Sequence, residues 1–356
     1  MCIIRLGFLS AITVTLCVIV VIVLFYINET VNIGLLRVHA AFLLPTVAST
    51  HLVSARKHFL YMRHRDGMPL SRCVDLCPRP DSRYAILVEY IGHKYVYLLS
   101  ALKLGVRLHL YLQSIRHETD LILEIVREVP PLVTDADVVS ALRAGYDQVC
   151  HTRPIDGGLY NRFGIFNMTQ YESVLYLDSD IIPVNDVSDL IRNGTLALQA
   201  AGKHVMWAHE IRADWFNAGV MLVLPNPDIF NQLMGLLQKL LASGHIKFIN
   251  HLFGEDFLPY TNKKDQAILN HVFHAQKGNA LRMPEKYNAL LFELTDTSEE
   301  VLRYAHLIHF IDSKPWKDPN CYLKYNYGRI CNMWFETPTV LSQVFLDAHS
   351  AYAPKS

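Results

Sequence analysis

The sequence lacks an excess of charge of either sign. Its 356 residues contain 33 Lys and Arg against 33 Asp and Glu, whereas a nucleic-acid partner usually requires a basic face. Blocks of like charge, short repeats and low-complexity tracts are also missing, so nothing indicates a disordered tail. With 51% hydrophobic residues, the chain can form one large domain or two small ones. We therefore expect a globular protein with no nucleic-acid partner.

The seven cysteines lack the pattern of a zinc site. Cys73 and Cys77 have metal-like spacing, but neither a second pair nor a histidine pair supplies the four ligands that structural zinc needs. Five cysteines lie beyond the N-terminal region, at Cys73, Cys77, Cys150, Cys321 and Cys331. This odd number allows two disulfides and one free thiol.

No charged residue occurs from Gly7 to Ile27, a stretch long enough to cross a bilayer as a helix. Arg5 before it and Glu29 after it favour a cytoplasmic N-terminus. A cleaved signal peptide is the alternative, although its apolar core is normally shorter. We expect a type II protein of the Golgi or ER membrane, with its body in the lumen and a glycan at Asn193. The expected organisation is a cytoplasmic tail at 1–6, an anchor at 7–27, a stem at 28–80, a globular domain at 81–345 and a tail at 346–356.

Beyond the stem, short apolar runs alternate with helical patterns. Residues 84–91, 106–113 and 173–180 have the length or alternation of strands, and residues 94–105, 138–146 and 158–171 have helical spacing. This alternation predicts an α/β fold with a largely parallel sheet. In such sheets ligands bind beyond the carboxyl ends of the strands, which is where Asp178 and Asp180 lie.

The two aspartates have the spacing of a metal site. In an extended chain, residues i and i+2 point to the same side, about 6.5–7 Å apart, so Asp178 and Asp180 converge while Ser179 faces away. Carboxylate oxygens suit Mg²⁺ or Mn²⁺, and an added imidazole favours Mn²⁺. The alternative is a turn in which one aspartate caps the chain and the other is solvated.

Three later segments carry further candidate side chains. "FNAG", from Phe216 to Gly219, precedes an apolar run with small residues that allow the backbone to approach a ligand. Asp265 and Gln266 begin a helical pattern, where Asp265 could simply be an N-cap. "HFIDSKPW" places His309 at the end of an apolar run, close to Lys314. His309 could be a core histidine, or it could complete an anion and metal site.

Together and in this order, these segments resemble glycosyltransferase family 8, the glycogenin-like family with the GT-A fold. The resemblance runs from near Tyr84 to Trp316 and is densest in "YNRFGIFNMTQYESVLYLDSDIIPVNDVSDLI". It continues in "FNAGVMLV", "DQAILN" and "HFIDSKPW". The sequence departs from the family pattern at Arg162, where Lys is common, and at Asp312 and Ser313, where the family carries Gly.

The resemblance implies a retaining glycosyltransferase that uses Mn²⁺ and a UDP-sugar, with residues 81–345 as the catalytic domain and a glycan, protein or lipid as acceptor. The implied metal ligands are Asp178, Asp180 and His309. The implied donor-binding residues are Arg153, Arg162, Ser179, Asn217, Ala218 and Lys314, and the implied catalytic residues are Asp265 and Gln266. Three alternatives stay open: an inverting GT-A enzyme with Asp256 or Asp265 as base, a non-catalytic lumenal relative that binds sugar or nucleotide, and a nucleotidyltransferase.

Overall fold

The computed structural model describes the greater part of the chain from residue 59 to residue 337. The described residues are 59–63, 69–75, 82–91, 95–112, 114–127, 140–141, 144–155, 160–202, 206–212, 215–243, 264–275, 280–291, 298–311, 314–317 and 328–337. They belong to one compact unit, His58–Ser356. The predicted anchor at 7–27 and the tail at 346–356 lie outside these residues. Within them, no helix is both long and apolar enough to cross a membrane.

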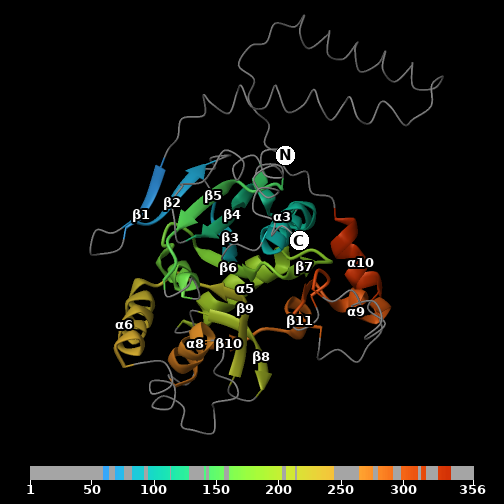
Figure 1. Cartoon of the computed structure of the whole chain (residues 1–356). Helices are drawn as coiled ribbons and strands as arrows, with labels where there is room; N and C mark the ends of the chain where they lie inside the picture. The colour runs from blue at the N-terminus through green and yellow to red at the C-terminus, as the bar shows by residue number, and fades with distance from the viewer. Residues whose placement is uncertain are drawn as a thin grey trace, which may run out of the picture. The chain divides into compact units, whose positions relative to one another are not determined.

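A sheet in the order β1-β2-β5-β4-β3-β6-β9-β8-β10 forms the centre of this unit (Figure 1). Its strands are β1 Phe59–Arg63, β2 Pro69–Asp75, β3 Tyr84–Ile91, β4 Thr119–Val126, β5 Gln148–Thr152, β6 Ser173–Asp178, β8 Met206–Arg212, β9 Trp215–Val223 and β10 Ala280–Arg282. The central strands β5, β4, β3 and β6 are parallel, as are β8 and β10. The other neighbours are antiparallel. The predicted α/β class is confirmed, and the sheet is mixed, with antiparallel pairs as frequent as parallel ones.

Helices cover both faces of this sheet. Alternate residues of a strand face opposite sides, so Ile86 and Val88 pack with helices α3 (Tyr95–Tyr111) and α5 (Ser188–Ala201) in one buried cluster. Ala85 and Leu87 pack on the other side with α6 (Pro227–Ser243) and α8 (Lys264–Ala275). The remaining helical segments are η1 Arg116–Glu118, η3 Asn161–Asn167, η5 Glu285–Tyr287, α9 Ser298–Tyr304 and α10 Gly328–Glu336.

Two predicted elements differ from the structure. Residues 106–113 were expected to form a strand, but α3 continues to Tyr111 because Leu104, Leu108 and Leu112, at helical spacing, are all buried. Gly105 does not end this helix. A Cβ on Gly105 would lie 2.4 Å from the Tyr146 ring, so glycine there serves close packing. The helix predicted at 158–171 is the shorter 3₁₀ segment η3.

The predicted stem at 28–80 includes two strands of the sheet. β1 pairs with β2, and β2 pairs with β5, so the sheet begins before residue 81. Cys73 on β2 lies opposite Cys150 on β5 in this register. Cys150 takes part in a disulfide, and so does Cys331. The expectation of disulfides is therefore confirmed.

The strand order changes direction between β3 and β6. From β3 the chain adds β4 and then β5 on one side, whereas β6 pairs with the other side of β3. Such a switch point opens a crevice beyond the carboxyl ends of the two strands. Asp178 is the last residue of β6. The fold therefore places the first of the paired aspartates at the expected ligand site.

A second sheet of three strands begins with the strand that follows β6 in the chain. It has the order β11-β12-β7, with β7 Ile181–Pro183, β11 Ala289–Leu290 and β12 Leu307–His309. β7 begins directly after Asp180 and pairs antiparallel with β12, so that His309 is opposite Ile181. This register brings the last residue of β12 to the paired aspartates.

Candidate active site

The ends of β6 and β12 bring three potential metal ligands together. The backbone N–H of Phe310 donates to the carbonyl of Asp180 over 3.0 Å, which fixes β12 against the turn after β6. One ligand atom each from Asp178, Asp180 and His309 lies within 4.8 Å of the others. The expected proximity of His309 to the two aspartates is confirmed.

This trio has the chemistry of a divalent-cation site. The Nε2 of His309 is 3.2 Å from Asp180 Oδ1 and 3.8 Å from Asp178 Oδ2, and the His309 residue is only 2% exposed. Two carboxylates this close repel each other unless a cation joins them. Two oxygen ligands and one imidazole fit Mn²⁺ or Mg²⁺.

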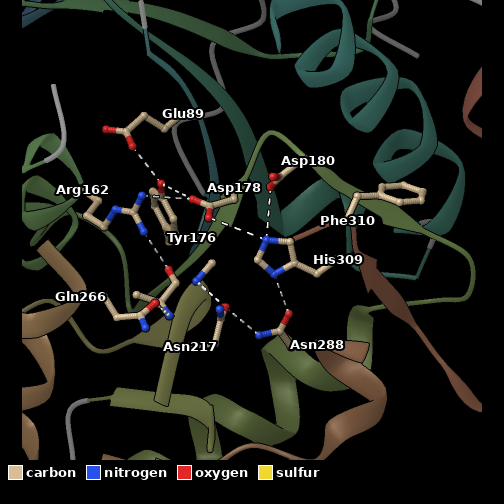
Figure 2. Close-up of polar contacts among 12 residues, drawn as sticks. Glu89, Arg162, Tyr176, Asp178, Asp180, Asn217, Gln266, Asn288, His309 and Phe310 are labelled. Carbon is tan, nitrogen blue, oxygen red and sulfur yellow. Dashed lines mark hydrogen bonds and ion pairs between the residues drawn. The ribbon is translucent and has the colours of Figure 1, made fainter. Parts of the chain in front are cut away.

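A chain of amides fixes the imidazole of His309. The Gly219 N–H donates to Asn217 Oδ1 over 2.8 Å, and Asn288 Nδ2 donates to the same oxygen over 3.1 Å. The remaining amide atom of Asn288, Oδ1, therefore accepts from Nδ1 of His309, at 3.1 Å. Figure 2 shows the imidazole with Asn288 on one side and the aspartates on the other. A proton on Nδ1 leaves the Nε2 lone pair available for a metal.

Replacing Asn288 by Leu is expected to weaken divalent-ion binding about tenfold, because the imidazole loses the acceptor that sets its tautomer and orientation. Calorimetric titration of the purified protein with Mn²⁺ measures this affinity. Asn185→Leu is a control, since the side chain of Asn185 donates to the carbonyls of Leu302 and Ala305 among the described residues. Equal Mn²⁺ affinity in Asn288→Leu and wild-type protein would contradict this role for Asn288.

Arg162 occupies the other side of Asp178. Its Nη2 is 3.2 Å from Asp178 Oδ1, its Nε is 2.8 Å from Asp265 Oδ2, and its Nη1 donates to the carbonyl of Ala218 over 3.1 Å. The guanidinium carbon lies 4.8 Å from the centre of the Tyr176 ring. Burial opposes the charge, but Asp178 and Asp265 outweigh it and raise the pKa of Arg162. Arg162 thus links Asp178, a candidate metal ligand, to α8 with a permanent positive charge.

Helix α8 is tied to β9 beside these groups. Ala218 N–H donates to Gln266 Oε1 over 3.1 Å, and Phe216 N–H donates to Asn270 Oδ1 over 2.8 Å. Asp265, in the first turn of α8, is 4% exposed. Burial raises the pKa of Asp265, while Arg162 opposes the change. Asp265 and Gln266 on α8 thus form one wall with Asn217 and Ala218 on β9, next to Arg162.

Lys314 supplies a second cation. Its Nζ contacts Asp180 Oδ2 and donates to the carbonyl of Phe310 over 3.0 Å. Burial lowers the pKa of Lys314 to about 8, although the charge of Asp178 opposes this. Lys314 and Arg162 thus flank the two aspartates with positive charge, an arrangement suited to a phosphate-bearing ligand.

Two predicted donor-binding residues stand apart. Arg153 is exposed after the end of β5, and Ser179 lies between the two aspartates. Neither side chain makes a hydrogen bond or ion pair with the cluster within the part of the chain that the structure describes. Asp256, Asp312 and Ser313 lie outside that part.

The sequence reasoning missed three side chains that contact the site: Glu89, Tyr176 and Asn288. Tyr176 sits inside an apolar strand and Asn288 follows a 3₁₀ turn, so neither forms part of a recognisable motif. Glu89 had a detectable signal, because a lone acid within the apolar run "YAILVEYI" is unusual for a buried strand.

Glu89 belongs to a row of acids across the parallel strands. In the register of β4, β3 and β6, Glu124 is beside Glu89 and Glu89 is beside Asp178. Thr152 Oγ1 donates to Glu124 over 2.5 Å. Burial raises the pKa of Glu124 to about 7, and the Thr152 hydrogen bond opposes it. Glu124 also lines a small pocket with residues of η3 and α6.

Replacing Glu124 by Gln is expected to remove a pH dependence of stability. The folded protein binds the proton of Glu124 more tightly than the unfolded chain does. The contribution of this proton to wild-type stability is therefore complete below about pH 4.5 and is lost as the pH rises through about 7. Glu124→Gln lacks this loss, so its free energy of unfolding should rise relative to that of wild type by up to about 3 kcal/mol between these pH values. Urea unfolding at several pH values measures it, with the exposed Glu285→Gln as control. Parallel stability curves for Glu124→Gln and wild type would contradict it.

Comparison with known proteins gives the family. The family model described as Glycosyl transferase family 8 matches residues 113–320, more than half of the chain. The chain belongs to glycosyl transferase family 8.

Curated relatives match the chain over part of their own length. It is 31% identical over 183 residues to inositol phosphorylceramide glucuronosyltransferase 1 of Arabidopsis thaliana, covering 49% of this chain and 32% of that protein. It is 27% identical over 218 residues to glycogenin of Cryptococcus neoformans, covering 54% and 22%. The chain therefore spans about a third or less of the length of these relatives. Among solved structures, the glycosyltransferase GlyE of Streptococcus pneumoniae TIGR4 is similar with a TM-score of 0.44 and 19% identity, covering 76% of this chain and 64% of that one.

Proposed function

We propose that this protein is a Mn²⁺-dependent retaining glycosyltransferase that transfers a sugar from a UDP-sugar to a glycan, protein or lipid acceptor. The observation that carries the proposal is the convergence of Asp178, Asp180 and His309 at the switch point of the sheet. Membership of glycosyl transferase family 8 supports the same reaction class.

The cations of the site fit a diphosphate leaving group. A divalent ion held by Asp178, Asp180 and His309 would act as a Lewis acid for the charge that develops on the departing UDP. Lys314 lies beside Asp180 and is positioned to bind a phosphate oxygen of the donor. Arg162 bridges Asp178 and Asp265 and so holds both carboxyl groups in place. These fixed charges stabilise the transition state where its negative charge grows.

The wall formed by α8 and β9 would hold the donor sugar. Gln266 uses its oxygen on the Ala218 N–H, which leaves its amide N–H groups to donate to a sugar or to the reacting face. Asp265 is already engaged by Arg162 at 2.8 Å. A carboxylate so paired is shielded from an acceptor hydroxyl, which supports the retaining reaction over an inverting one with Asp265 as base.

We place the reaction in the secretory pathway. The uncharged stretch from Gly7 to Ile27 supports a membrane anchor there. The disulfide-bonded Cys150 and Cys331 support an oxidising compartment. The catalytic unit would then face the lumen of the Golgi or ER.

The test is a screen for UDP release by the purified full chain, with Mn²⁺ present or chelated. The donor panel includes UDP-glucuronic acid, because one relative is named a glucuronosyltransferase, together with UDP-glucose, UDP-galactose, UDP-xylose and UDP-N-acetylglucosamine. We expect one donor to be turned over with Mn²⁺ and not after chelation. Tight donor binding without UDP release from any donor would instead favour the non-catalytic alternative.

A further inference from the structure

Glu89 is a buried acid with no evident structural purpose. It lies on β3 at the switch point, beside Asp178 in the register of β3 and β6. It is only 3% exposed, and its Oε1 is buried without a hydrogen-bond partner among the described residues. A half-satisfied buried carboxyl weakens a fold relative to an apolar side chain of the same size. Packing alone therefore does not explain why an acid stands here.

Glu89 is connected to Asp178 through one hydroxyl. The Tyr176 hydroxyl is 2.8 Å from Glu89 Oε2 and 2.8 Å from Asp178 Oδ1 (Figure 2). The hydroxyl has one proton and two lone pairs, and it lies within hydrogen-bond distance of both carboxyl groups. The Tyr176 hydroxyl therefore joins Glu89 to Asp178 through a chain of hydrogen bonds.

This chain ends on one oxygen of Asp178. Oδ1 receives the Tyr176 hydroxyl and also the Nη2 of Arg162, at 3.2 Å. The other oxygen, Oδ2, faces Nε2 of His309 at 3.8 Å. Contacts to Oδ1 from two sides fix the plane of the Asp178 carboxylate, so that Oδ2 points toward His309 and the candidate ion site.

We propose that Glu89 is a positioning residue, which acts through the Tyr176 hydroxyl to hold Asp178 with one oxygen directed at the divalent-ion site. The inference deepens the proposed function, since it rests on the same metal site. Partners of ligating carboxylates commonly change metal affinity 10–100-fold when removed. Glu89 contacts neither donor nor metal in this role, so its effect appears first in metal affinity.

The experiment measures Mn²⁺ binding to the full chain without donor, by the electron paramagnetic resonance of free Mn²⁺, together with the midpoint of thermal unfolding. Glu89→Met should raise the Kd for Mn²⁺ about tenfold, while the metal-free midpoint stays at or above that of wild type. Glu89→Gln, whose amide can donate to the Tyr176 oxygen, should bind Mn²⁺ within about twofold of wild type. Glu124→Gln alters the neighbouring acid of the row without touching Tyr176 and should leave the Kd unchanged.

The double variant tests the route through the hydroxyl. Tyr176→Phe alone should raise the Kd at least as much as Glu89→Met, and the Glu89→Met/Tyr176→Phe pair should be no weaker than Tyr176→Phe. Three results would each overturn the proposal. They are a wild-type Kd in Glu89→Met, effects on the Kd that multiply in the double variant, and a rise in Kd accompanied by a fall in the midpoint of thermal unfolding. Tyr176→Phe decides the question if Glu89→Met does not fold. If wild-type protein bound no Mn²⁺, the metal site of the proposed function would fall as well, which separates the two failures.

Discussion

Asp180→Asn is expected to lower UDP release and sugar transfer by roughly 10³-fold or more, the range seen when a main electrostatic contact to a transition state is lost. Asp180 Oδ1 is 3.2 Å from His309 Nε2, and its Oδ2 contacts Lys314. An amide of the same shape is a poor ligand for Mn²⁺ and pairs weakly with the lysine. The variant therefore loses both the ion and part of the orientation of Lys314. Steady-state UDP release at saturating Mn²⁺ measures the effect.

The fold of Asp180→Asn should stay close to wild type. His309 keeps its bond to Asn288, Lys314 keeps the carbonyl of Phe310, and the repulsion between the two aspartates is relieved. Circular dichroism and thermal unfolding report on this. Asp189→Asn, an exposed change in the first turn of α5, is the matched control and should turn over normally. Substantial activity in Asp180→Asn would exclude the metal mechanism.

The strands that carry the site were predictable from the sequence because their apolar runs are short and bounded. β3 and β6 occur where apolar length indicated strands. β9 begins at Trp215, so that "FNAG" lies within this strand instead of preceding an apolar run. The helix α3 was not fully predicted, since the residues after Gly105 alternate like a strand while their leucines also fit a helix. Only the burial of Leu108 and Leu112 against the sheet decides between the two periods.

The metal trio was only half predictable from local pattern. The spacing of Asp178 and Asp180 indicates convergence by itself, whereas the approach of His309 depends on the antiparallel register of β7 and β12. No local pattern encodes a register between segments so far apart. The assignment of His309 to the site came from the family resemblance. Arg162 was expected to bind the donor, and the structure engages it with Asp178 and Asp265. Asn288 and Tyr176 were missed because their roles arise only from contacts across the fold.

The close approach of β9 to the metal trio depends on Gly219. Leu177 pairs with Val220 across β6 and β9, which brings Gly219 beside the end of β6. A Cβ on Gly219 would lie 2.2 Å from Cε1 of His309 and 2.9 Å from Oδ2 of Asp178. Neither distance is possible for a real side chain. The imidazole cannot move away freely, because its Nδ1 is hydrogen-bonded to Asn288. The backbone of β9 can thus take its position only if residue 219 has no side chain.

Gly219→Ala is therefore expected to displace the imidazole and to weaken Mn²⁺ binding by at least about 100-fold, since a direct ligand is lost rather than one of its partners. Overpacking should also lower the free energy of unfolding by about 1–3 kcal/mol. Calorimetric Mn²⁺ titration and urea unfolding measure the two effects. Adding His309→Ala to Gly219→Ala should recover part of the stability without restoring Mn²⁺ binding, because it removes the ring that the new methyl group meets.

Gly235→Ala is the matched control for this glycine. Gly235 lies within α6, and a Cβ there would meet no atom within 4 Å. Alanine at that position should stabilise the protein by up to about 1 kcal/mol through helix propensity and leave Mn²⁺ binding unchanged. Normal Mn²⁺ affinity in Gly219→Ala would mean that β9 can retreat without disturbing His309. The imidazole would then not depend on the position of β9, and the geometry proposed for the metal site would be wrong.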